Sequence, residues 1–412
     1  MARSPYALTL LALALGVCAA ISRPAVALET DQFTVPDSAL PDLGPEVNVY
    51  VAATLFDLVQ ELNGRADAHD RAARASALPL LRDYHRGRAA RYRSEDLLAR
   101  RVYDALAGTS LPECRIELWV RRYRFRAARE TPGRSKMFHM TTARGVYGDS
   151  VFSKPLLLVD LSPTINVHGS YVGLDKLGHL FQQGYEYHRE FRREERRGGD
   201  ERRATARAVR LGVAQERGVY GELLVGVYSN ADLAANYAGM KFYLNLTREV
   251  DVGGQTLPPL LSRDGRGSWV FNPHRRPADL LRPFVGDHFN EALNPSRFRP
   301  GFRETVQARL RRRAQKLVEF YDTTAERERE RMVELSTWHG EKYGHCGFER
   351  LVTIADNCPP PRSAPPSPAD VPDAAGAVVA GGTVPRSPPA PTPSAEASPP
   401  GGRSAPPRLS TR

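Results

Sequence analysis

The 412-residue chain has few cysteines and little long apolar sequence, and both shortages limit what it can be. Four cysteines are too few for a disulfide-rich scaffold, and they show neither the Cys-x-x-Cys spacing of a redox centre nor a cysteine/histidine spacing for zinc. The HExxH motif of zinc hydrolases is also missing. After residue 27, no stretch approaches the roughly 20 apolar residues of a spanning helix. We therefore expect no transmembrane span in the mature chain.

The one long apolar run, residues 7–20, follows a basic start and has about the length of a signal-peptide core. Residues 25–27 read Ala-Val-Ala, the small-x-small pattern that signal peptidase cleaves. We expect residues 1–27 to be a cleaved signal peptide and the chain to be exported, either periplasmic or secreted. Two alternatives remain open: acylation of Cys18 as in a lipoprotein, although a bulky valine precedes it, and an uncleaved membrane anchor.

The C-terminal residues 359–412 consist mainly of Pro, Ser, Ala and Gly and contain almost no large apolar side chains. Such a segment buries too little surface to offset the entropy lost on ordering. We therefore predict a disordered tail and one folded domain over residues 28–358, which is long enough to form a real core.

The formal charge of +11 raises the question of nucleic-acid binding, but the distribution of charge argues against it. Arginines alternate with acidic residues in 189–210 and again in 326–331, as on solvated helix faces. No nucleic-acid recognition motif accompanies them. We expect no nucleic-acid partner, whereas attraction to an anionic envelope component, lipid or glycan, stays open.

Three cysteines remain after the predicted signal peptide. Cys346 and Cys358 are close in sequence, and an oxidising compartment favours a disulfide between them. Cys114 lies in a strand-like segment, where a buried free thiol is expected.

Hydrophobic periodicity predicts an α+β fold that is mainly helical, with a central helix pair and a small antiparallel β region. Helical spacing is found in residues 47–62, 95–107, 174–191, 206–228, 231–244 and 303–334. Strand-like alternation is found in residues 115–125, 136–147 and 155–161.

The helix predicted at 174–191 has a row of polar side chains. Asp175, His179, Gln182 and Glu186 follow the spacing i, i+4, i+7 and i+11, which places them on one helix face, and Lys176 adjoins the row. Flanking leucines and a phenylalanine make this face an unusual place for solvated side chains.

The following helical segments contain the partners that could complete a site. Glu222 stands among apolar neighbours, and Asp232 and Asn236 lie one turn apart. If the two helices pack antiparallel, His179 could meet Glu222 or Asp232.

These residues leave two interpretations open. A histidine with carboxylates can hold a divalent metal or act as a general acid and base, with His179, Glu222 and Asp232 as candidate catalytic residues and His179 as candidate ligand. The candidate binding residues are Asp175, Lys176, Gln182, Glu186 and Asn236. The alternative is a structural polar network, because Ser229 and Asp232 match a capping box. One histidine is also fewer than most zinc sites use.

The pattern Asp-Lys-x-x-His, a later Glu, then Asp-x-x-Ala-Asn-x-x-Gly resembles VanZ-like proteins and the small YfiM-type envelope lipoproteins. The residues that carry the resemblance, over about 65 of 412 positions, are Asp175, Lys176, His179, Glu222, Asp232, Ala235, Asn236 and Gly239. The resemblance implies an envelope setting and a shared helix-pair geometry, but no reaction. VanZ-like proteins lie in the membrane, whereas these helices are not apolar enough to span it.

Residues 269–298 are rich in aromatics, Pro and Asn, and we favour an ordered loop that packs its aromatics across the helix pair. The alternative is that Asp287, His288 and Glu291 join a polar cleft. The sequence thus predicts an exported, envelope-associated protein whose helix-pair site binds an envelope component. The alternative is a periplasmic or secreted hydrolase, metal-assisted through a divalent ion, that uses His179 and nearby carboxylates.

Overall fold

The computed structural model describes residues 30–108, 114–130, 137–140, 144–147, 161–218, 221–223 and 226–357. The predicted signal peptide and C-terminal tail lie outside these residues, as does the strand predicted at 155–161 except for Leu161. Cys358 also lies outside them, and with it the predicted disulfide to Cys346.

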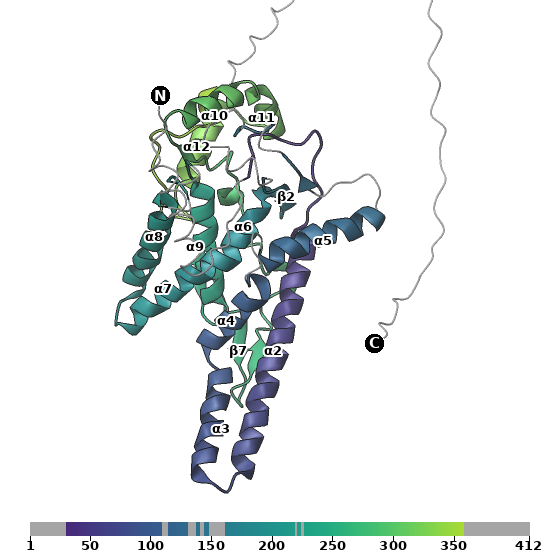
Figure 1. Cartoon of the computed structure of the whole chain (residues 1–412), viewed down its shortest axis with the longest axis vertical. Helices are drawn as coiled ribbons and strands as arrows, with labels where there is room; N and C mark the ends of the chain where they lie inside the picture. The colour runs from purple at the N-terminus through teal and green to yellow at the C-terminus, as the bar shows by residue number, and fades with distance from the viewer. Residues whose placement is uncertain are drawn as a thin grey trace, which may run out of the picture. The chain divides into compact units, whose positions relative to one another are not determined.

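The fold is α+β and mainly helical, as the periodicity predicted (Figure 1). The helices are α2 (Gly44–Ala75), α3 (Pro79–Tyr92), α4 (Glu95–Leu106), α5 (Arg115–Glu130), α6 (Leu174–Gly178), the π-helical turn η3 (His179–Gln183), α7 (Gly184–Arg196), α8 (Glu201–Arg217), α9 (Asn230–Asn245), α10 (Phe302–Arg311), α11 (Ala314–Phe320) and α12 (Ala325–Leu335). Single 3-10 turns are η4 (Pro277–Asp279), η5 (Asp287–Phe289) and η6 (Ala355–Asn357).

The strands are short and pair in antiparallel fashion. They form the sheet β1 (Met137–Phe138), β2 (Thr164–Val167) and β3 (Ser170–Gly173), and the pairs β4 (Val227–Tyr228) with β9 (Arg297–Phe298), β5 (Val250–Val252) with β6 (Gln255–Leu257), and β7 (Leu261–Arg263) with β8 (Trp269–Phe271).

Helix α9 is the centre of the fold, since each of its residues is buried. The continuous helical stretch of α6, η3 and α7 packs along one side of it, and α8 covers another (Figure 1). A helix that is buried all round must be apolar or must pair its polar side chains. The Asp, Asn and Lys side chains of α9 therefore need partners inside the protein.

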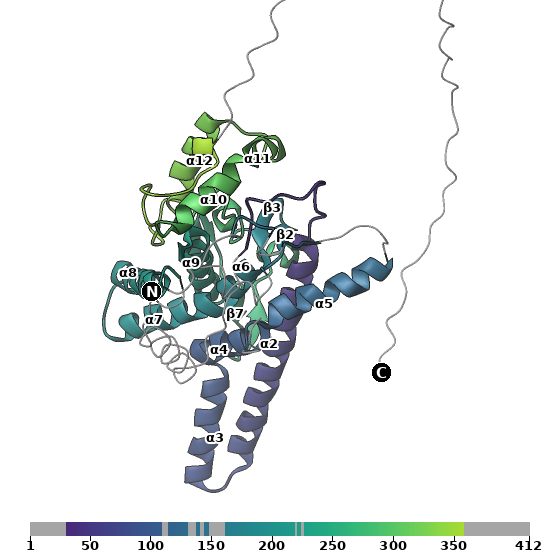
Figure 2. The ribbon, with the colours of Figure 1, turned by 45° about the horizontal axis from the view of Figure 1, so that its top comes forward.

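Helices α2 and α3 lie side by side as a hairpin, and its end farthest from α9 extends away from the other helices (Figures 1 and 2). Helix α2 agrees with the predicted helix at 47–62 but continues to Ala75, and α3 was not predicted. Helix α3 buries only Ala89 among its own residues, which explains its weak periodicity.

The strand predicted at residues 115–125 is wrong, because this segment is helix α5. Ile116 and Val120 are buried at the i, i+4 spacing of one helix face. The Glu117 carboxylate accepts a hydrogen bond from the backbone N–H of Cys114 (3.0 Å) and so satisfies a free donor at the helix start. Cys114 itself is a buried free thiol, as expected.

Other predicted boundaries also need correction. The helix predicted at 206–228 begins at Glu201 and ends at Arg217. The helix predicted at 303–334 is three helices, with a break at Asp322 where φ is +44°. Of the strand predicted at 136–147, the described residues form only Met137–Phe138. Among the described helices, none combines the length and apolarity needed to cross a membrane.

Candidate functional site

Two glycines let the helix pair approach closely. A Cβ atom on Gly239 of α9 would lie 2.0 Å from the carbonyl oxygen of Leu180, and one on Gly184 would lie 2.5 Å from the Cα of Gly239. Only a residue without a side chain fits either position. The close crossing brings the first two turns of α9 opposite His179.

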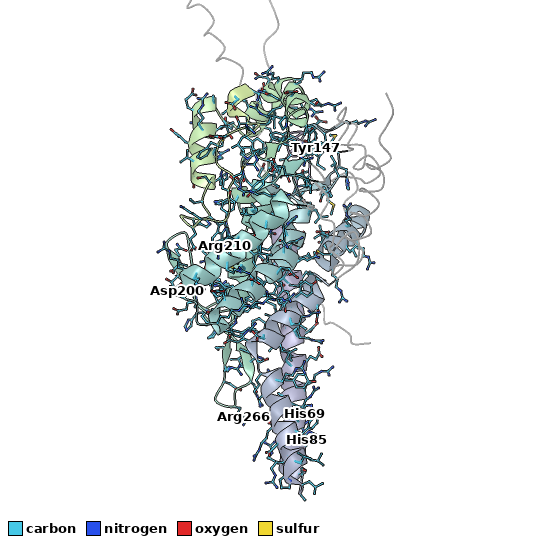
Figure 3. All side chains as sticks on the ribbon, turned by 60° about the vertical axis from the view of Figure 1, so that its left-hand side comes forward. His69, His85, Tyr147, Asp200, Arg210 and Arg266 are labelled. Atoms are coloured by element: carbon cyan, nitrogen blue, oxygen red, sulfur yellow. The ribbon has the colours of Figure 1, made fainter. Side chains whose placement is uncertain are left out.

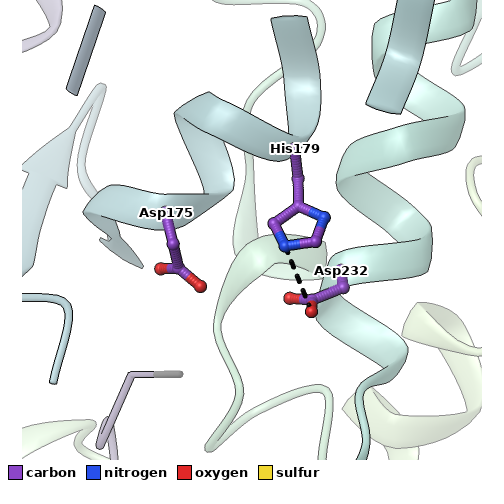
Figure 4. A group of neighbouring side chains, drawn as sticks. All are labelled: Asp175, His179 and Asp232. Atoms are coloured by element: carbon purple, nitrogen blue, oxygen red, sulfur yellow. Dashed lines mark ion pairs between the residues drawn. The ribbon is translucent and has the colours of Figure 1, made fainter. Parts of the chain in front are cut away.

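Both ring nitrogens of His179 face oxygen atoms of α9. Nε2 lies 3.2 Å from Oδ2 of Asp232 (Figure 4). Nδ1 lies 3.0 Å from Oδ1 of Asn236. Nδ1 meets the geometry of a hydrogen bond to Asn236, whereas the contact of Nε2 with Asp232 is an ion-pair contact without a hydrogen bond. The ring is therefore held at Nδ1, and Nε2 faces the Asp232 carboxylate.

Lys176 is the centre of a buried ionic cluster. Its Nζ lies 2.7 Å from Oδ2 of Asp175, 2.5 Å from Oδ1 of Asp232 and 2.5 Å from Oε1 of Glu291. The lysine side chain is fully buried, and its three partners come from α6, α9 and the loop after η5. One ammonium group thus joins three segments of the chain.

The carboxylates hold further hydrogen bonds that fix their positions. Oδ1 of Asp175 accepts from the hydroxyl of Thr30 (2.6 Å), and the Asp175 backbone N–H donates to the hydroxyl of Ser162 (2.9 Å). Oε2 of Glu291 accepts from the hydroxyl of Tyr147 (3.3 Å). Buried charges are tolerated when they are paired and hydrogen-bonded in this way.

The cluster contains more carboxyl groups than cations. The pKa of Glu291 is raised to about 8, because burial together with Asp175 and Asp232 outweighs the lowering effect of Lys176. Burial and Asp232 also raise the pKa of Glu216 well above its usual range. Burial raises the pKa of Asp232 too, but His179 and Lys176 outweigh it and the pKa is lowered. Protons on carboxyl groups with raised pKa values therefore neutralise part of the excess negative charge of the cluster.

The structure brings together five residues of the sequence pattern, Asp175, Lys176, His179, Asp232 and Asn236. Gln182 and Glu186 do not join them. The π-helical turn His179–Gln183 inserts an extra residue, which rotates the following helix by about 100°. Glu186 instead lies near Arg189 (3.4 Å) on the surface.

Glu222 lies outside the cluster as well. It follows the end of α8 and forms an ion pair with Arg297 (2.8 Å). Glu216 occupies the position that the sequence analysis assigned to Glu222. Its carboxylate accepts a hydrogen bond from the backbone N–H of Ser229 (2.9 Å), next to Asp232. Its sequence signal is the row Ala204, Ala208, Gly212 and Glu216, which follows a spacing of four along the buried face of α8.

The loop between β8 and β9 contributes one of its three predicted residues. Glu291 joins the cluster, whereas Asp287 accepts a hydrogen bond from Ser170 (2.8 Å) and His288 contacts the carbonyl oxygen of Thr337 (2.9 Å). Thr30 was not predicted, and no pattern near it pointed to the site. The capping interaction expected at Ser229 is present, with its hydroxyl accepting from the N–H of Asp232 (3.1 Å).

Within the described part of the chain, Asp175, His179 and Asp232 form a group that could hold a metal ion. One ligand atom from each lies within 4.8 Å of the other two. Imidazole nitrogen and carboxylate oxygen suit several divalent ions, and three protein ligands leave room for water, as in catalytic sites. Lys176 contacts two of the same carboxylates, so a bound ion must share them with the ammonium group.

Comparison of the chain with protein families, with curated proteins and with solved structures finds no match. The resemblance to VanZ-like proteins therefore stays a prediction from the sequence.

Proposed function

We propose that the protein works in the cell envelope after export, and that Asp175, His179 and Asp232 hold a divalent metal ion used in a hydrolytic reaction. The observation that carries the proposal is the convergence of one imidazole and two carboxylates within 4.8 Å at the helix crossing. A bound ion of this kind supplies a nucleophilic water at neutral pH.

The charge of the cluster supports a cation site. Four buried carboxyl groups, those of Asp175, Asp232, Glu291 and Glu216, surround Lys176 and His179. The raised pKa values of Glu291 and Glu216 reflect burial and too little positive charge around them. A divalent cation would replace protons in balancing this surplus.

The chain's own residues have distinct parts in this proposal. The side chains of His179 and Asp232 are 8% and 9% exposed, whereas that of Lys176 is fully buried. Substrate would therefore approach from the His179 and Asp232 edge. Asn236 orients the ring through Nδ1, and Lys176 holds both aspartates from the inner side.

A non-catalytic envelope protein that binds a lipid or glycan is the second candidate. It is favoured by the pairing of Lys176 with both Asp175 and Asp232, because the ammonium group already supplies positive charge where a metal ion would bind.

Metal analysis of the purified protein separates the two candidates. We expect one Zn²⁺ or Mn²⁺ per chain by titration calorimetry and elemental analysis, with loss of the ion in His179→Ala and Asp232→Asn. The control is His274→Ala, which removes an exposed histidine outside the cluster. Absence of a bound ion in the wild type would refute the metal site. Export is tested separately, by mass spectrometry of the extracytoplasmic protein, which should begin at residue 28.

A further inference from the structure

The end of the α2–α3 hairpin exposes large apolar side chains. Leu78, Leu80 and Leu81 are 62%, 83% and 46% exposed, and Tyr84 is 55% exposed. They lie at the turn and in the first two turns of α3, within a span of seven residues. Single exposed leucines are ordinary on protein surfaces, but a cluster of them indicates an interaction site.

The hairpin that carries these leucines is basic. Residues 65–91, which cover the facing stretches of α2 and α3, contain seven arginines and three aspartates, a net charge of +4. Of the aspartates, Asp83 pairs with Arg86 at 3.6 Å, and Asp67 and Asp70 pair with Arg93 at 3.5 and 2.7 Å. Helix α7 differs, because Glu190 there pairs with both Arg193 and Arg207. The hairpin therefore keeps a surplus of positive charge next to its leucines.

The position of the hairpin leaves this end accessible. Helix α3 is 14 residues long, which corresponds to about 21 Å. Figure 3 shows His69 and His85 of the hairpin at the opposite end of the structure from Tyr147, which contacts the ionic cluster. An apolar end with arginines behind it thus extends away from the candidate site.

We propose that this hairpin end binds an anionic lipid surface, with the leucines entering the boundary between headgroups and acyl chains and the arginines contacting lipid phosphates. The leucines favour a bilayer over a purely polar glycan, because insertion removes apolar surface from water. The surplus of arginine is complementary to anionic headgroups. This proposal names the envelope component and does not depend on the metal site.

Vesicle co-sedimentation tests the proposal with the chain expressed without residues 1–27, whose apolar run would itself enter a bilayer. We expect binding to vesicles that contain phosphatidylglycerol and much weaker binding to pure phosphatidylcholine. Leu80→Gln/Leu81→Gln should weaken binding about tenfold or more through loss of apolar burial. Arg71→Gln/Arg74→Gln should weaken it about tenfold through loss of electrostatic attraction.

Two matched controls separate the hairpin from general surface effects. Leu223→Gln removes a leucine that is 58% exposed elsewhere, and Arg202→Gln/Arg210→Gln removes two exposed charges from α8. Both should bind as the wild type does. The proposal fails if the wild type does not bind anionic vesicles, or if the hairpin variants bind no worse than the controls. Self-association that is lost in Leu80→Gln/Leu81→Gln, without vesicle binding, would identify a second copy of the chain as the occupant instead.

Discussion

Lys176 and Glu291 form an ion pair of 2.5 Å in which the lysine side chain is fully buried and that of the glutamate is 1% exposed. They are separated by 115 residues in sequence. The pair joins helix α6 to the loop that follows η5, and Asp175 and Asp232 complete the environment of the ammonium group. The stability of this region should therefore depend on one side chain.

Replacing Lys176 with methionine should lower the free energy of unfolding by about 3–5 kcal/mol, because it leaves buried carboxylates without their cation. Urea unfolding followed by circular dichroism measures the change. The control is Lys316→Met, whose partner Asp37 is 96% exposed, and this variant should lose much less stability than Lys176→Met. Equal losses in both variants would contradict a central role for Lys176.

The contribution of Glu291 to stability should fall as pH rises from about 4.5 to about 8, because the folded state keeps a proton on Glu291 that the unfolded chain releases. An acid whose pKa is raised by folding stabilises the folded state at low pH. This stabilisation is lost completely once the pH exceeds the folded-state pKa. The variant Glu291→Gln removes this titration, so its unfolding free energy should vary less over the same range. Urea unfolding at a series of pH values measures both slopes, and identical slopes would count against the assignment.

Gly239→Ala should destabilise the protein by about 1–3 kcal/mol or more, because its methyl group would meet the carbonyl oxygen of Leu180 at 2.0 Å. Gly64→Ala is the matched control in α2, where an added Cβ meets nothing within 4 Å. That variant should gain up to about 1 kcal/mol from helix propensity. Thermal unfolding of the two variants should therefore shift in opposite directions.

Glu216→Ala should cost about 1–3 kcal/mol, since it removes the buried acceptor for the N–H of Ser229. Glu222→Ala should cost less than about 1 kcal/mol, because its ion pair with Arg297 is partly exposed. Chemical denaturation ranks the two. A larger loss for Glu222→Ala than for Glu216→Ala would instead support the sequence-based assignment of Glu222 to the cluster.

The sequence determined the elements that depend on local periodicity. It predicted the helices that carry His179 and Asp232, and the four-residue spacings placed Asp175 with His179 and Asp232 with Asn236. These predictions succeeded because side chains one turn apart share a helix face whatever surrounds them. The same reasoning misjudged residues 115–125, where a short apolar pattern fits a strand as well as a helix.

Only the tertiary structure decided the membership of the cluster. Thr30 and Glu291 reach Lys176 and Asp175 from distant segments, and no local pattern encodes such contacts. The π-helical turn rotated Glu186 away, and the end of α8 at Arg217 replaced Glu222 by Glu216. Both outcomes follow from packing around the buried helix α9, where each polar group must find a partner inside the protein.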